Sequence, residues 1–115
     1  MVSGIPSAVK EEYERREWPR LRVALPASVT TASQDFNAKL VNIERCGAML
    51  ETAAVVEAGS RVMLRCGTID AEATVIWAES GGVGIRLLTR LTDSQIAEQL
   101  SRSAAMAARR AKSVT

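Results

Sequence analysis

Apolar and polar residues alternate over most of the chain, which is the period of half-buried β-strands. In the first run, Leu21, Val23 and Leu25 share one side of the strand. Polar and glycine-containing segments separate the later runs, and Gly81-Gly82 is a hairpin signal. The pattern predicts six strands, at residues 21–30, 37–43, 48–51, 61–66, 69–78 and 83–88.

Six short strands with close turns are typical of an antiparallel barrel, because closure leaves no unpaired strand edge. Pro26 lacks an N–H group, so it predicts an edge position or a bulge in the first strand. In the fifth strand the alternation places Val75 and Trp77 on the same face. The predicted core consists of Leu21, Val23, Leu25, Leu40, Val62, Leu64, Val75, Trp77, Val83 and Ile85.

The period changes after Thr92, which forms a capping box with Gln95. Apolar residues then recur at helical spacing from Ile96 to Ala111, so we expect a C-terminal helix. Its narrow, alanine-rich stripe either covers one end of the barrel or forms a homodimer seam. The predicted organisation is a flexible N-terminal arm (1–14), a barrel domain (15–91) and a helix with a basic tail (92–115).

Charge is unevenly distributed along the 115 residues. The net charge is +2, but residues 101–115 carry Arg102, Arg109, Arg110 and Lys112 without an acid, which leaves −2 for the rest. A negatively charged body disfavours binding to duplex nucleic acid, which needs a basic face on the fold itself.

The available side-chain chemistry indicates a binding protein rather than an enzyme. The chain has no histidine, the commonest general base and metal ligand, and Cys46 and Cys66 do not form a CxxC pair. We therefore expect no catalytic residue, no metal site and no cofactor. With no apolar N-terminal segment and no run of about 18 apolar residues, we expect a cytoplasmic protein without a membrane span.

Two polar segments flank the first two predicted strands. Residues 14–20 read Glu-Arg-Arg-Glu-Trp-Pro-Arg, and residues 42–47 read Asn-Ile-Glu-Arg-Cys-Gly. Arg16 and Arg20 stand four apart, and arginine presents a planar fork of donors that engages phosphate oxygens in pairs. A turn that ends in Gly47 allows close approach to the backbone. The two segments together predict a site for a doubly anionic ligand that carries a base.

This pair of segments resembles the PilZ family, which has RxxxR before its first strand and [DN]xSxxG after its second. Residues 55–62, 74–77 and 82–87 are similar to later family segments, so the resemblance covers residues 14–91. It implies a six-stranded antiparallel PilZ-type barrel that binds the bacterial second messenger cyclic di-GMP. The ligand-binding residues that it implies are Arg15, Arg16, Arg20, Asn42, Glu44 and Gly47.

The same arginine spacing recurs at Arg61/Arg65 and at Arg86/Arg90. Both pairs lie in or beside predicted strands, where residues four apart share a face. We expect these four side chains on the solvated exterior of the barrel, outside the ligand site.

Glu44 departs from the family pattern, which has serine at this position. A carboxylate that faced the phosphates at about 4 Å would weaken binding by about 1–4 kcal/mol. A carboxylate that faced the guanine N1–H and N2–H₂ groups would instead accept hydrogen bonds from them. A third interpretation is that Glu44 pairs with Arg16 or Arg20 and takes the place of the ligand.

Two functions follow from these alternatives. The first is a signalling adaptor that binds cyclic di-GMP and relays the signal to a protein partner. The second is a PilZ interaction module that acts without ligand because its site is degenerate at Glu44.

Overall fold

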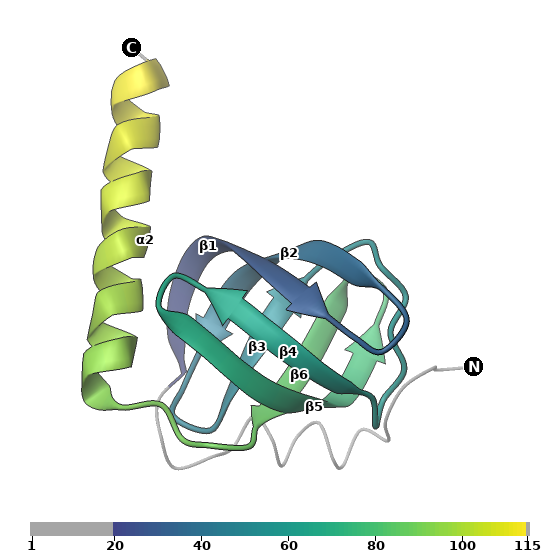
Figure 1. The fold of residues 1–115 in the computed structure, drawn as a ribbon. Coiled ribbons are helices and arrows are strands. Elements are labelled where there is room, and N and C mark those ends of the chain that lie inside the picture. Colours follow the sequence, from purple (N-terminus) through teal and green to yellow (C-terminus); the bar gives the residue numbers. More distant parts are fainter. Residues whose placement is uncertain (1–19, 115) are drawn as a thin grey trace.

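Each alternating run forms a strand in the computed structural model, which describes residues 20–114 and, of these, the side chains of residues 20–111. The strands pair antiparallel in the order β1-β2-β3-β6-β5-β4 and close a barrel (Figure 1). Residues 28–30 of β1 close it by pairing with residues 63–65 of β4. The predicted six-stranded barrel with a C-terminal helix is confirmed. The elements are β1 (Leu21–Thr30), β2 (Asp35–Ile43), β3 (Gly47–Glu51), β4 (Arg61–Cys66), β5 (Ile69–Glu79), β6 (Gly82–Leu87) and α2 (Asp93–Val114).

Apolar side chains from all six strands fill the barrel. Of the ten predicted core residues, nine are buried, whereas Leu21 is half-buried and packs at the edge of the core. Val62 and Leu64 are buried while Arg61 and Arg65 are exposed, which confirms the predicted phase of β4.

Trp77 is buried as expected, but on the opposite side of β5 from Val75. Val75 pairs with Ile85 and Trp77 pairs with Gly84, so Ile76 is an extra residue between two successive pairs. Such a bulge reverses the side to which the following residue points. Trp77 therefore lies on the outer surface of the barrel, and the predicted common face of Val75 and Trp77 is wrong.

The indole of Trp77 lies directly over Gly84 on β6. A Cβ atom at Gly84 would stand 2.2 Å from Nε1 of Trp77, closer than a non-bonded contact allows. At the neighbouring Gly82 the same atom would stand 3.5 Å from the indole, an ordinary van der Waals contact. Gly84 is therefore required for the indole to lie against the strand.

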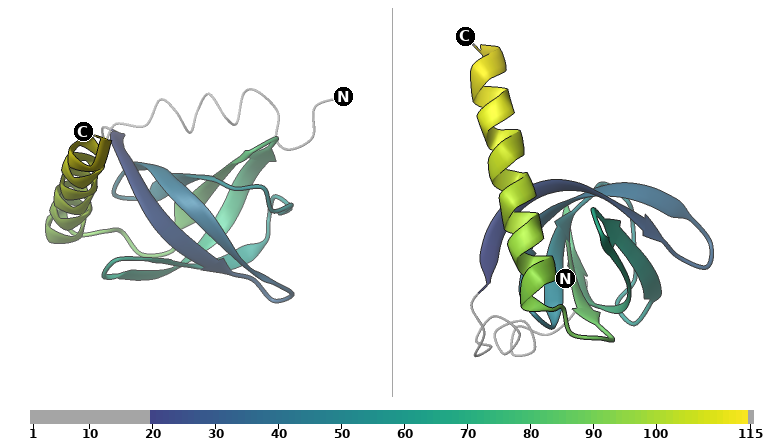
Figure 2. Two further views of the ribbon diagram at one scale, coloured as in Figure 1. Left: turned by 90° about the horizontal axis from the view of Figure 1, so that it is seen from above. Right: turned by 60° about the vertical axis from the view of Figure 1, so that its left-hand side comes forward.

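The helix α2 begins with the predicted capping box. Oγ1 of Thr92 accepts a hydrogen bond from N of Gln95 at 3.0 Å, and Oε1 of Gln95 accepts one from N of Thr92 at 2.8 Å. Ile96 and Leu100 pack against the barrel core. The helix lies beside β1, and its C-terminal part extends beyond the barrel (Figures 1 and 2).

A hydrogen bond fixes α2 where the β1–β2 ladder is irregular. The register shifts between Arg22 and Leu25, and within this segment N of Ala24 donates to Oγ of Ser103 at 2.9 Å. Pro26 follows directly and precedes the residues of β1 that pair with β4. An irregularity near Pro26 agrees with the sequence prediction.

The β4–β5 turn provides the second polar attachment of α2. Gln99 is completely buried, and its Oε1 accepts a hydrogen bond from Sγ of Cys66, the last residue of β4, at 3.9 Å. The hydroxyl of Thr68 donates to the carboxylate of Glu98. Burial raises the pKa of the Cys66 thiol, and the nearby Arg102 guanidinium partly opposes this rise.

The close contact at Gly84 predicts a position-specific loss of stability. Gly84→Ala should lower the free energy of unfolding by about 1–3 kcal/mol, because the methyl group must displace the indole. Gly82→Ala is the matched control, since its methyl group meets only ordinary contacts. Urea unfolding checks this, and equal midpoints for the two variants would contradict it.

The raised pKa of Cys66 predicts a loss of stability at alkaline pH. The unfolded thiol ionises before the folded one, so the unfolded state releases its proton first and folding stability falls as pH rises through this range. Cys66→Ala should make the decline between pH 8 and pH 10 (roughly the range in which thiols titrate) shallower. Cys46→Ala is the control, and an unchanged decline in Cys66→Ala would refute the interpretation.

Candidate functional site

Strand register brings five residues into one row on the outside of the barrel. Arg22 pairs with Asn42, Asn42 with Met49, Met49 with Gly84, and Gly84 with Trp77. Asn42 reaches this face because the β2–β3 register shifts between Leu40 and Asn42. Its side-chain Nδ2 donates to Sδ of Met49 at 3.5 Å. The row therefore combines a guanidinium, an amide, a thioether and an indole across five adjacent strands.

The second motif forms the tight turn between β2 and β3. N of Glu44 donates to O of Gly47 at 2.9 Å, which closes the turn. Ile43 points into the core on one side of the motif, and Ala48 does so on the other. The residues between them are therefore held at the rim of the barrel.

Four of the six predicted ligand-binding residues line one small pocket: Arg20, Asn42, Glu44 and Gly47. Met49 and Trp77 supply apolar parts of its wall. Its volume is about 10 Å³, which is room for one water molecule at most. In this conformation the pocket is closed to any ligand larger than water.

Glu44 is the most deeply placed polar member of this pocket, with 1% of its surface exposed. A carboxylate is normally buried only where hydrogen bonds or positive charge compensate for lost hydration. Arg20, an exposed residue with a positive charge, lines the same pocket. Arg15 and Arg16, the other two predicted residues, lie outside the described residues.

Arg86 is a residue of this surface that the motif analysis placed outside the site. It is exposed on β6 as expected, but it pairs directly with Gly47. Among the described residues it has no ion-pair partner. The pairing of β3 with β6 identifies Arg86 as a neighbour of the motif turn, and the spacing of arginines in the sequence does not encode that pairing.

Arg61 and Arg65 behave as the solvated exterior pair that we expected. Nη1 of Arg61 lies 2.6 Å from Oε2 of Glu72, and Nε of Arg65 lies 3.6 Å from Oδ1 of Asp70. Both arginines bridge β4 and β5 and are thereby neutralised.

The motif turn is also joined to the start of α2. N of Leu87 donates to O of Cys46, and N of Leu91 donates to O of Arg45, each at 2.8 Å. Nη2 of Arg45 lies 2.5 Å from Oδ1 of Asp93, the first residue of the helix. A displacement of the turn would therefore act on the segment from which α2 begins.

The described part of the chain contains no cluster of acidic and cysteine side chains that could hold a metal ion. Within the same part, no helix has the length and apolar character needed to cross a membrane.

Comparison with known proteins identifies the fold and its family. A family model described as "PilZ domain" matches residues 14–105, which is most of the chain. No curated protein matches the sequence.

Two solved structures share the architecture. The PilZ domain of CeSA from a cellulose-synthesizing bacterium has a TM-score of 0.54 and 18% identity, over 67% of this chain and 85% of that one. The Bacillus subtilis inhibitor of motility MotI/DgrA has a TM-score of 0.57 and 16% identity, over 83% of this chain. The match spans about half of MotI/DgrA (52%). At these identities the likeness concerns the fold.

Proposed function

The chain belongs to the PilZ domain family, and we propose that it is a cytoplasmic bacterial adaptor that binds cyclic di-GMP and relays binding to a protein partner. The observation that carries the proposal is the convergence of Arg20, Asn42, Glu44 and Gly47 on one pocket. These residues come from two separate motifs, and strand pairing accounts for their proximity.

The arginines supply the phosphate and guanine contacts in this proposal. Arg20 stands on the exposed side of the pocket, and Arg16 and Arg15 precede it in the chain. Arg86 adds a cation on the other side of Gly47. Guanidinium groups suit this ligand because they bind phosphate oxygens in pairs and stack on flat bases.

Asn42 and Glu44 bind the edge of a guanine in this proposal. The pocket wall formed by Met49 and Trp77 is apolar, which suits a flat base better than a phosphate. The Glu44 carboxylate accepts hydrogen bonds from N1–H and N2–H₂ of the guanine. Because the pocket now has room for one water at most, the base enters only as the surrounding side chains move apart.

The relay runs from the motif turn to α2. The exposed Arg45–Asp93 ion pair contributes little on its own, about 0–1 kcal/mol. The backbone hydrogen bonds from Leu87 and Leu91 to the turn are the stiffer connection. Ligand that repositions the turn therefore shifts the first residues of the helix.

A ligand-independent interaction module is the second candidate function. The burial of Glu44 in a closed pocket favours it, because a carboxylate held there can substitute for a ligand. Its partner contacts would then be constant rather than switched.

Calorimetric titration with cyclic di-GMP should show binding that depends on Arg20. Arg20→Ala should weaken binding by about 10- to 150-fold, the value of one charge-assisted contact. Arg86→Ala should weaken it by about tenfold for the same reason. Arg65→Ala, which removes an exterior ion pair, is the matched control and should bind as the unchanged protein does.

Glu44→Ser separates the three roles of the carboxylate in the same titration. Weaker binding supports hydrogen bonding to guanine. Tighter binding shows that the carboxylate opposes the phosphates or occupies the site, and the proposed hydrogen bonding of Glu44 to guanine is then wrong. No heat at millimolar ligand removes the receptor proposal and leaves the interaction module.

The relay predicts a change in hydrogen exchange that is confined to particular segments. Saturating cyclic di-GMP should slow exchange in residues 44–47 and 91–100 but not in the β1–β2 hairpin at residues 31–34. Arg45→Ala removes the ion pair but keeps the backbone hydrogen bonds, so it should reduce the effect in α2 only slightly while binding heat persists. Binding heat without any change in α2 would refute the relay alone.

A further inference from the structure

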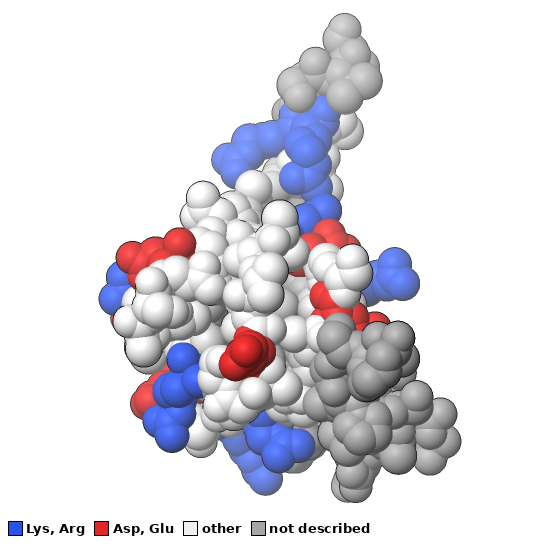
Figure 3. Space-filling view, turned by 90° about the vertical axis from the view of Figure 1, so that its right-hand side faces the viewer, with Lys and Arg blue, Asp and Glu red and all other residues white. Residues whose placement is uncertain are grey.

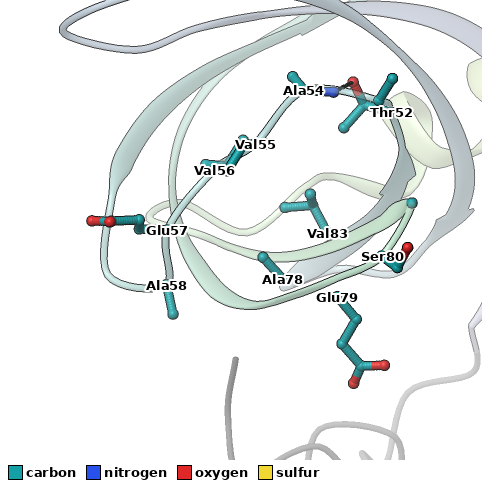
Figure 4. A pocket seen from close by; sticks show the side chains of 12 residues that line it. Thr52, Ala54, Val55, Val56, Glu57, Ala58, Ala78, Glu79, Ser80 and Val83 are labelled. Atoms are coloured by element: carbon teal, nitrogen blue, oxygen red, sulfur yellow. Dashed lines mark hydrogen bonds between the residues drawn. The ribbon is translucent and has the colours of Figure 1, made fainter. Parts of the chain in front are cut away.

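A second cavity of the described barrel shares no lining residue with the candidate site. It lies between the β3–β4 loop (residues 52–60) and the β5–β6 hairpin, with a volume of about 820 Å³ (Figure 4). We propose that it docks a partner-protein segment that carries an apolar side chain next to lysine or arginine. The proposal stands whether or not the chain binds cyclic di-GMP.

The interior of this cavity is apolar. Val56, Ala78 and Val83 lie around its middle (Figure 4), and all three belong to or pack against the barrel core. Val55 lines it too and is 84% exposed, the most exposed large apolar side chain among those described. Exposed apolar surface beside a cavity is typical of protein-interaction sites.

The charge of the rim specifies the partner. Glu57 lines the cavity, its carboxylate lies toward the periphery, and no described lining residue is basic (Figure 4). The adjoining shallow groove adds Glu51 and one base, Lys39. Figure 3 shows this end of the barrel as a largely uncharged surface with both acidic and basic side chains around it. An apolar interior with acidic side chains at its rim complements an apolar side chain flanked by positive charge.

Hydrogen bonds hold the loop in place. N of Thr52 donates to O of Gly81 at 3.2 Å, and Oγ1 of Thr52 donates to O of Asn37 at 3.1 Å. Nε2 of Gln34 donates to O of Val55 at 3.1 Å, and N of Gly59 donates to O of Val75 at 2.7 Å. A cavity that is already formed requires little ordering when a partner binds.

The polar groups of the cavity favour a peptide segment over a small metabolite. Small-molecule sites carry a few precisely directed polar groups within an apolar cavity. Here Oγ1 of Thr52 is already engaged by Asn37 and Ala54, and the carboxylates stand at the periphery rather than inside. One protein segment can supply both an apolar side chain for the interior of the cavity and a basic side chain for its acidic rim.

The test is a titration of the ¹⁵N-labelled full chain, without cyclic di-GMP, with the synthetic peptide acetyl-Gly-Lys-Leu-Leu-Lys-Gly-amide. We expect saturable amide shifts in residues 52–58 and 78–83 at millimolar peptide. The peptide with glutamate for lysine, and the one with glycine for leucine, should each bind about tenfold more weakly or worse, which corresponds to about 1.4 kcal/mol.

Matched variants locate the contact on the protein. Val55→Asp and Glu57→Lys change exposed side chains, so the fold should be retained, and each should weaken peptide binding about tenfold. Leu88→Asp and Asp35→Lys alter an exposed apolar residue and an exposed acid elsewhere, and should bind like the unchanged chain.

Three outcomes would overturn the proposal: no shifts at saturation of peptide solubility, shifts outside the two segments, or equal binding of the glutamate peptide. Concentration-dependent self-association that Val55→Asp abolishes would show that a second copy of this chain occupies the cavity instead.

Discussion

The extra residue at Ile76 in β5 is the constraint on which the candidate site depends. In a regular strand Trp77 would point with Val75 into an interior that apolar side chains already fill. The bulge turns the indole outward, and Gly84 gives it the space to lie flat on β6. A second irregularity, before Asn42, turns that amide onto the same outer face. The wall of the candidate pocket thus exists because two strands depart from strict alternation at matching heights on the barrel.

These same departures mark the limit of what the sequence predicts. Strand positions, the barrel, the capping box and most core residues follow from the period of two and from turn residues. The orientation of Trp77 does not, because Val75, Ile76 and Trp77 are all apolar and nothing local shows which one is extra. The sequence likewise places Arg86 on the exterior but does not place it beside Gly47, because that pairing depends on strand register. Sequence proximity identifies motifs, whereas the site is assembled across strands.

Glu44 stands where the PilZ pattern has serine, and this difference changes the energetics of the pocket without changing the fold. Serine in this turn would leave a small hydroxyl, whereas the longer carboxylate reaches a buried position beside Asn42 and Trp77. A buried carboxylate is stable only with compensating partners, so any incoming base must replace those partners as well as open the pocket. Under the receptor proposal, the affinity for cyclic di-GMP is therefore a difference between the closed and the ligand-bound states of this pocket. Direct contacts alone do not determine it.

The helix is attached to the barrel at points that differ in stiffness, and this difference decides how a signal would travel. The Thr68–Glu98 and Ser103–Ala24 hydrogen bonds fix its middle against the β4–β5 turn and β1. Its first residue is held to the motif turn by an exposed ion pair, and the preceding Leu91 by a backbone hydrogen bond. A displaced turn would consequently tilt the first turns of α2 about a fixed middle. The part of α2 that extends beyond the barrel, including the exposed Arg109, would then move with this tilt.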